Sequence, residues 1–198
     1  MEPEKLKKLV RQNDNEARRQ LFEAYYKRTY SVAFNILRRR ENAEDITQDA
    51  FIKAFKNIDQ LKDGAKFGAW LAVITSNLAR NYLKREKRIL FTDEETVAPG
   101  ESEVNYTEDS AMRNLEIDRI RKAIRKLPAE QYQAVVLQYY YDLKVEDIAG
   151  MLELRPGTVK SRLHRARQRL AGELEQKGDS ACLLDKGGAG DPGPKKKT

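Results

Sequence analysis

The sequence predicts an all-α protein made of two small helical domains joined by a flexible acidic linker. Apolar residues recur at steps of three or four along most of the chain, and no window alternates like a strand over more than a few residues. The charge also falls into blocks, with a net charge of +8 over residues 1–91, −8 over 92–118 and +5 over 119–175. Two basic blocks around an acidic one indicate two modules that bind polyanions, although basic faces that only solubilise helices would give the same totals.

The composition excludes several classes of protein. The 198 residues carry a formal net charge of +7 and a mean hydropathy of −0.77. No apolar run approaches the roughly 18–20 residues that span a bilayer, and the N-terminus lacks the apolar stretch of a secretory signal. One cysteine and one histidine leave no internal disulfide framework and almost nothing for a zinc site. We therefore expect a soluble, cytoplasmic protein without metal, cofactor, small-molecule substrate or membrane insertion.

Shifts in composition indicate where the domains begin and end. We expect an N-terminal domain over residues 1–91, an acidic linker over 92–111, a C-terminal domain over 112–175 and a disordered tail over 176–198. The connector reads FTDEETVAPGESEVNYTED and sustains neither the helical nor the strand period. The tail contains GDSACLLDKGGAGDPGPKKKT and is too poor in apolar residues to bury a core.

Three helices are expected in the N-terminal domain. Asp14 is placed to cap the first, whose periodic positions are Leu21, Phe22, Tyr25, Tyr26, Thr29, Ala33 and Leu37. The second opens at Asn42, with Asp45 at a capping-box position, and its buried stripe with flanking phenylalanines is Ile46, Ala50, Phe51, Ala54, Phe55 and Ile58. After a break at Lys62-Asp63-Gly64, a third helix ends in the basic run KREKR and carries Trp70, Leu71, Ile74, Leu78 and Tyr82.

Four helices are expected in the C-terminal domain. The first has the apolar positions Leu115, Ile117, Ile120, Ile124 and Leu127. The second begins at Pro128, because proline is well tolerated in a first helical turn, and runs through Val135, Val136 and Tyr139 to a break near Asp142. The last two are VEDIAGML and, after LRP, GTVKSRLHRARQRL. A short helix, a tight turn and a longer basic helix form the helix-turn-helix arrangement.

The last of these helices has the pattern of a helix that reads DNA. At roughly 100° per residue, one narrow face holds Val159, Leu163, Ala166 and Leu170, and this face must point to the core. The opposite face and its flanks present side chains suited to base edges and phosphates: Arg155, Thr158, Lys160, Ser161, Arg162, His164, Arg165 and Gln168. From Arg155 to Leu170 there are six Arg and Lys and no acidic residue, whereas a merely solvated helix would mix in Asp or Glu. His164 taken alone is more often an incidental surface histidine.

Four segments, in the same order, resemble the extracytoplasmic-function (ECF) sigma factors, the minimal bacterial transcription initiation factors. IAGMLELRPGTVKSRLHRARQRL looks like their promoter-reading helix-turn-helix, and LPAEQYQAVVLQYYYDLKVEDIA is similar to the entry into their second domain. NAEDITQDAFIKAFKNI resembles their core-polymerase-binding helix, and FGAWLAVITSNLARNYLKR their promoter-melting segment. The resemblance covers roughly residues 15–90 and 112–172. Glu153 occupies a turn position where the family often has glycine, so we expect slight strain in that turn.

The resemblance implies that the second helix docks on the basic coiled coil of the polymerase clamp through complementary charge. The side chains that face away from its apolar stripe are Asp45, Gln48, Asp49 and Lys53. From the residues alone, an ordinary solvated face with a favourable N-terminal acid explains this pattern equally well. The resemblance also implies contacts with the polymerase flap, with promoter DNA in double- and single-stranded form, and with an anti-sigma factor.

The resemblance assigns the third helix, and the loop Leu61–Phe67 ahead of it, to promoter melting and to a pocket for a base extruded from the downstream promoter element. The candidate contacts combine cations, aromatic rings and amides, which suit single-stranded DNA: Lys62, Lys66, Phe67, Trp70, Asn77, Arg80, Asn81, Lys84, Arg85 and Arg88. Asn77 and Asn81 share a helix face because they are four residues apart. Trp70, in phase with Ile74, is more readily explained as a core residue. Melting would use binding energy and no nucleotide hydrolysis by this chain.

Two other functions fit parts of the sequence. A helix-turn-helix regulator that acts without polymerase explains residues 119–175, but it explains neither the second basic module nor the acidic linker. A nuclease would need a reactive constellation, and the sequence has no P-loop, no Gly-rich dinucleotide turn and no convincing nucleophile–base pair. We therefore expect no catalytic residues, and a sigma factor that needs core RNA polymerase to act.

The acidic linker leads to a separate hypothesis. A free segment of this charge would partly screen the basic faces, and in the family the equivalent connector threads through the nucleic-acid channels of the polymerase. Neutral substitutions are predicted to raise the affinity of the free protein for DNA and to alter the yield of abortive transcripts. The positions concerned are Asp93, Glu94, Glu95, Glu101 and Glu103.

Overall fold

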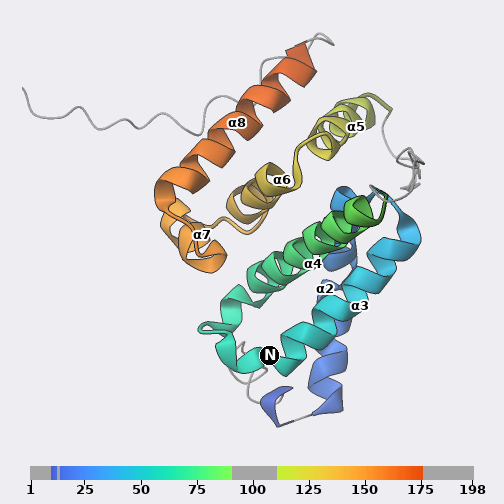
Figure 1. Ribbon diagram of the computed structural model, residues 1–198, viewed down its shortest axis with the longest axis vertical. Helices are drawn as coiled ribbons and strands as arrows, with labels where there is room; N and C mark the ends of the chain where they lie inside the picture. Colours follow the sequence, from blue (N-terminus) through green and yellow to red (C-terminus); the bar gives the residue numbers. More distant parts are fainter. Residues whose placement is uncertain (1–9, 13, 91–110, 176–198) are drawn as a thin grey trace, which may run out of the picture.

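The computed structural model describes residues 10–12, 14–90 and 111–175, and within these ranges the chain forms helices and turns without any strand. In the N-terminal domain the elements are α2 (Asn15–Leu37), α3 (Arg40–Lys56), the 3-10 turns η1 (Ile58–Gln60) and η2 (Gly64–Lys66), and α4 (Phe67–Leu90). In the C-terminal domain they are α5 (Ala111–Arg125), α6 (Ala129–Val135), the π-helical turn η3 (Val136–Tyr140), α7 (Val145–Leu152) and α8 (Pro156–Glu175) (Figure 1). The prediction of two helical domains is confirmed.

The acidic linker, apart from Ala111, and the tail that contains Cys182 lie outside the described residues. The hypotheses about both segments therefore stay predictions. Within the described helices, none is both long and apolar enough to cross a membrane. The same residues contain no group of three or more His, Cys, Asp or Glu side chains that could hold a metal ion.

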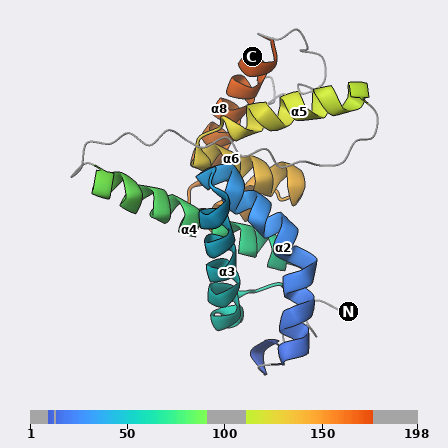
Figure 2. The same cartoon turned by 90° about the vertical axis from the view of Figure 1, so that its right-hand side faces the viewer.

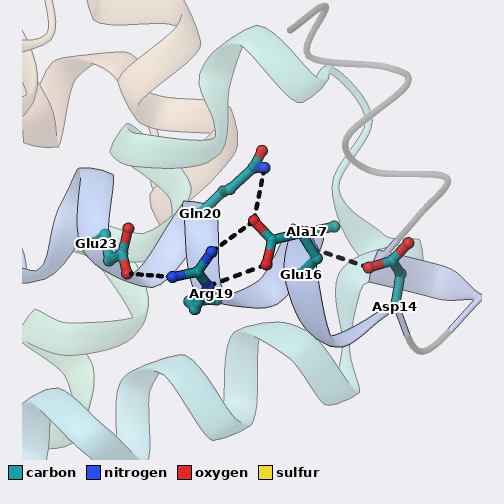
Figure 3. A network of polar contacts seen from close by, with 6 residues as sticks. All are labelled: Asp14, Glu16, Ala17, Arg19, Gln20 and Glu23. Carbon is teal, nitrogen blue, oxygen red and sulfur yellow. Dashed lines mark hydrogen bonds and ion pairs between the residues drawn. The ribbon is translucent and has the colours of Figure 1, made fainter.

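Helix α2 begins where the sequence predicts. The Asp14 carboxylate accepts a hydrogen bond of 3.0 Å from the backbone N–H of Ala17, which satisfies one of the free donors of the first turn. Arg19 then donates to Glu16 at 2.9 Å and lies 3.5 Å from Glu23, so that one guanidinium joins two turns of the helix (Figure 3). These charges are exposed, and water screens them, so the N-cap and not the ion pairs fixes the start of α2.

The predicted start of α3 at Asn42 is wrong. The helix begins two residues earlier, and its capping position, Arg39, makes no side-chain hydrogen bond to the first turn. The Arg39 guanidinium instead donates to Glu86 near the end of α4 at 2.5 Å. The residue ahead of α3 is therefore engaged with α4, and Asp45 lies too far into the helix for the predicted capping role.

The segment after Pro128 also differs from the single helix that was predicted. Its first part is α-helical, and the helix then widens into the π-helical turn η3. The helical segment ends at the predicted break, where Asp142 has a positive φ of 51°. Tyr139, predicted as a periodic apolar position, is 52% exposed. Ile117 and Phe22, which the period also placed on apolar faces, are likewise exposed. Tyr139 lies inside the π-helical turn η3, where a constant period of 3.6 residues no longer applies.

The two domains share a hydrophobic core. One continuous cluster of buried side chains contains Val73 and Ala79 of α4 together with Tyr132 and Leu137 of the C-terminal domain. Helix α4 contacts α2 and α3 within its own domain and α6 and α7 of the other, and both views show it beside α6 (Figures 1 and 2). A second cluster, which includes Leu71, lies entirely within the N-terminal domain. Helix α4 therefore serves both as a core element and as the docking surface for the second domain.

Candidate nucleic-acid and polymerase interfaces

Helix α8 is positioned by the turn that follows α7. Glu153 adopts the left-handed conformation with φ 54° and ψ 43°, and the backbone N–H of Leu154 donates to the carbonyl of Ala149 at 2.9 Å. This is the helix end at which glycine is usual, so the strain expected at Glu153 is confirmed. The turn redirects the chain so that Val159, Leu163 and the rest of their stripe face the core.

The predicted core stripe of α8 is confirmed. Val159, Leu163 and Ala166 are fully buried, and Leu170 packs against the same cluster. All but one of the predicted DNA contacts on the other side are exposed. The exposed residues are Arg155, Thr158, Lys160, Ser161, His164, Arg165 and Gln168. The Ser161 hydroxyl donates to the Gly157 carbonyl one turn earlier at 2.9 Å. The exception is Arg162, whose side chain is 17% exposed and is paired with Glu130.

The face of α3 opposite its buried stripe is polar and open. Asp45, Gln48, Asp49 and Lys53 are all exposed, while the stripe that includes Ile46 and Ala50 is buried as predicted. Ile52 lies among them and is 52% exposed, although the sequence did not mark it as part of this face. An apolar side chain within a charged rim is the usual composition of a protein–protein interface.

The loop ahead of α4 and the first turn of that helix form an aromatic cluster. Phe67 is buried and lies edge-on to Tyr25 with ring centroids 5.2 Å apart, and Trp70 is half-buried beside it at 6.2 Å. The Asp63 carboxylate accepts a hydrogen bond of 2.8 Å from Ala65 N–H, which fixes the loop, and Lys62 is exposed. The structure therefore places Phe67 and Trp70 in the core of the domain, and Lys62 at its surface.

The remaining predicted melting residues lie along α4. Asn77, Asn81, Lys84, Arg85 and Arg88 are exposed, whereas Arg80 is half-buried. The Asn77 side-chain oxygen accepts hydrogen bonds from Arg80 and, at 3.5 Å, from Gln133 of α6. The two amides thus share a face as predicted, but Asn77 is already engaged by the other domain.

Acidic side chains of the C-terminal domain pair with the predicted melting residues. Lys66 donates to Asp147 at 2.9 Å, and the two side chains are 36% and 40% exposed. Glu130 lies between two arginines, 3.6 Å from Arg80 of α4 and 2.9 Å from Arg162 of α8. Burial lowers the pKa of Arg80, an effect that nearby Glu130 opposes and Arg162 reinforces.

A further polar contact between the domains lies near the end of α2. Arg38, in the left-handed conformation there, has its pKa lowered to about 10 by burial and by the nearby charge of Arg125. Burial also raises the pKa of Tyr132 to about 12, against the opposing effect of a hydrogen bond with Asn35. The hydroxyl therefore stays neutral at physiological pH.

Sequence reasoning missed the residues that join the domains. Glu130, Asp147 and Tyr141 lie far in sequence from their partners. In the sequence, an acidic residue in a first helical turn indicates only a favourable interaction with the helix dipole, and not a contact with another domain. Gly68 also went unnoticed, although a β-carbon there would lie 2.9 Å from Tyr141 Cε1 and 2.6 Å from Tyr25 Cε1. The one usable signal was the run of three tyrosines at 139–141, because so many large aromatic side chains in a row indicate a contact surface.

Two family models match the chain. Sigma-70 region 2 matches residues 21–89, which span α2 to α4, and sigma-70 region 4 matches residues 117–170, which span most of the C-terminal helices. Each match falls on one helical domain. The residues between the two matches include 91–110, which the structure does not describe.

The chain is also similar to known proteins over most of its length. ECF RNA polymerase sigma factor SigW of Bacillus subtilis (strain 168) is 32% identical over 84% of this chain and 94% of its own length. ECF RNA polymerase sigma-E factor of Haemophilus influenzae is 30% identical over 84% and 92%. The sigma factor RpoE of Bartonella quintana, solved in complex with the anti-sigma factor NepR, superposes with a TM-score of 0.65 and 25% identity, over 79% of this chain and 96% of that one. With both regions present in order and a relative matched over nearly its whole length, the chain belongs to the ECF RNA polymerase sigma factors.

Proposed function

We propose a division of labour among three faces of this sigma factor. Helix α8 reads the upstream promoter element in duplex DNA, α4 with the loop ahead of it binds the downstream element as a single strand, and α3 docks on the clamp coiled coil of core RNA polymerase. The observation that carries the proposal is the exposed face of α8 between Thr158 and Gln168, which is basic and polar and lies opposite the buried residues Val159, Leu163 and Ala166.

Upstream recognition follows from the side chains on that face. Arg165 carries a planar set of donors that can bind guanine through two hydrogen bonds, whereas Lys160 and Thr158 suit phosphates. A recognition helix needs a rigid support, and the buried residues Val159 and Leu163 provide it. The C-terminal domain also contributes the contact with the polymerase flap.

Downstream binding would use the exposed part of α4. Asn81 can bond the edge of an unpaired base, and Lys84, Arg85 and Arg88 can follow the phosphates of a single strand. Binding energy then offsets the few kcal/mol that base extrusion costs. The chain performs no chemical step itself, so we assign it no catalytic residue and no enzymatic activity.

The family indicates where the protein works and what restrains it. Its polymerase and its promoter DNA are in the cytoplasm, so we place the protein there. The solved relative RpoE is bound by an anti-sigma factor, and we propose a regulator of the same class for this chain.

Assembly with core RNA polymerase tests the proposal. The purified protein should form a complex with the polymerase on a sizing column, and promoter-specific DNA binding should appear only in that complex. Sequence-specific binding to duplex DNA by the protein alone would instead identify a conventional helix-turn-helix regulator. Cleavage of the DNA would identify a nuclease.

A further inference from the structure

Two arginines from different domains lie near one another at the end of α2 without an acidic partner. Arg38 directly follows α2, and Arg125 is the last residue of α5. Both are half-buried. Among the described residues, the Arg38 guanidinium donates one hydrogen bond, of 3.4 Å, to the side-chain oxygen of Asn35, and neither guanidinium forms an ion pair. No carboxylate of the described chain therefore compensates these two charges.

The packing of the two domains brings these cations together. Their neighbours in sequence, Leu37 and Ile124, pack in one hydrophobic cluster, which also contains Tyr132 of α6. Figure 2 shows the end of α2 that leads into α3 beside α6. Burial lowers the pKa of Arg38, and the nearby charge of Arg125 lowers it further. The two like charges therefore repel one another in a partly dry setting, where repulsion is stronger than in water.

Other half-buried arginines near the domain contact do have acidic partners. Arg39 donates to Glu86 at 2.5 Å, and Glu130 lies 3.6 Å from Arg80 and 2.9 Å from Arg162. Charges removed from water are usually paired in this way, because an unpaired charge is costly to bury. The two unpaired cations at the end of α2 thus indicate a place for a negative group that the described chain does not supply.

The side chains around these cations favour a phosphate as that group. A guanidinium presents a planar set of donors that matches two oxygens of a phosphate. The hydrogen bond with Asn35 lowers the pKa of Tyr132, so Asn35 donates it and the phenolic proton is left for another acceptor. Lys122 is exposed one turn before Arg125 on the same face of α5. The cluster thus offers donors to a group that mainly accepts hydrogen bonds.

We propose that Arg38, Lys122 and Arg125 form a binding site for a phosphate group, carried by inorganic phosphate or by a nucleotide, at the junction of the two domains. A small anion fits better than duplex DNA, because both guanidiniums are half-buried. The site is independent of the sigma-factor role proposed above. A phosphate bound there contacts both domains, so its binding free energy adds to the stability of the folded chain.

Calorimetric titration of the full chain with inorganic phosphate, in a buffer without other oxyanions, tests the site. The variant Arg38→Gln/Arg125→Gln removes both guanidiniums. The matched control is Lys27→Gln/Arg169→Gln, which also removes one cation from each domain. Both control residues are exposed and form no hydrogen bond or ion pair with a described residue.

We expect phosphate to bind the wild type and the control alike. It should bind the double arginine variant about tenfold more weakly or not at all, because each lost guanidinium removes charge-assisted hydrogen bonds. Equal affinity in the double arginine variant and the control would overturn the proposal, and so would a wild type that does not bind phosphate.

Thermal unfolding followed by circular dichroism separates loss of the site from loss of the fold. Without phosphate, the double arginine variant should be at least as stable as the wild type, because the repulsion between the two cations is gone. Phosphate should then stabilise the wild type and the control but not this variant. A variant that is less stable without phosphate would show that the guanidiniums are structural. Equal stabilisation by sodium chloride at the same ionic strength would show screening alone. Either result contradicts the site.

Nucleotides identify the source of the phosphate group. Adenosine and guanosine monophosphates are titrated beside inorganic phosphate, since all three carry a single phosphate group. Tighter binding of a nucleotide assigns the site to that nucleotide, whereas equal or tighter binding of inorganic phosphate assigns it to the free ion. Binding of none of the three contradicts the proposal.

Discussion

Lys66 donates from its ammonium to Asp147 Oδ1 at 2.9 Å, which joins the turn ahead of α4 to the first turn of α7 across 81 residues of sequence. This hydrogen bond is the main cause of the lowered pKa of the Asp147 carboxyl and of the raised pKa of the Lys66 ammonium. The contact lies over a segment that is proposed to bind DNA. It therefore links the ionisation of one carboxylate to the accessibility of that segment.

The contact is predicted to depend on pH at both extremes. Because folding lowers the pKa of Asp147, the ionised carboxylate stabilises the folded protein. This stabilisation is fully present above the ordinary aspartate pKa of about 3.9 and is lost as the pH falls through the lowered value. Because folding raises the pKa of Lys66, the charged ammonium also stabilises the folded protein. This stabilisation is fully present below about pH 10.4 and is lost as the pH rises through the raised value. Scattering should show Asp147→Asn more expanded than wild type at neutral pH, and the two equal in strong acid. A difference that persists unchanged in acid would contradict this assignment.

Promoter reading should be sensitive to Arg165. Arg165→Ala is expected to lose about 1–3 kcal/mol of discrimination for the upstream element, since a bidentate arginine–guanine contact is worth that much. Ser161→Ala should weaken the same element by less. Competition between promoter and scrambled DNA, with the holoenzyme, measures the effect, and Arg169→Ala serves as the control because this exposed arginine is not assigned to a base. Equal losses on both DNAs would place Arg165 on a phosphate.

Polymerase docking should depend on the acidic face of α3. Asp45→Lys with Asp49→Lys is expected to abolish holoenzyme assembly while the domain stays folded, because both side chains are exposed and lie off the buried stripe. Native gel shift of core polymerase gives the readout. The control, Glu146→Lys with Glu175→Lys, makes the same change of charge in the other domain and should assemble normally. Loss of helicity in the α3 variant would mean that this face has a structural role.

The shared core predicts the cost of a cavity in α8. Leu163 is 1% exposed, and Leu163→Ala should lower the free energy of unfolding by about 2–5 kcal/mol. Leu170→Ala, at a half-buried position of the same stripe, should cost clearly less. Urea denaturation followed by circular dichroism measures both. Equal costs would show that the end of α8 is as tightly packed as its centre.

The sequence was sufficient for the local features of the fold and of the interfaces. The helical period located the buried stripes of α3 and α8, because residues such as Ala50 and Val159 recur at fixed spacing on one face. Asp14 could be recognised as a cap because capping needs only neighbours in sequence. The same local reasoning placed Asp45, Asp49 and Arg165 at the surface.

Contacts between distant segments could not be predicted in this way. Arg39, just ahead of α3, is bonded to Glu86 of α4, and nothing in the local pattern links the two. The exposed Tyr139 lies in the π-helical turn η3, and a constant period of 3.6 residues cannot anticipate such a turn. Likewise, Glu130 lies between Arg80 and Arg162 only because the two domains pack together.

Promoter opening is the measurement that tests the sigma-factor assignment most directly. Core RNA polymerase, this protein and a supercoiled promoter plasmid are mixed without nucleotides and treated with permanganate, which oxidises unpaired thymines. We expect reactive thymines at the downstream element with wild type, a strong reduction with Asp45→Lys/Asp49→Lys, and no reactivity without the protein. Polymerase that binds this protein normally but leaves every thymine of a responsive promoter unreactive would contradict the sigma-factor assignment.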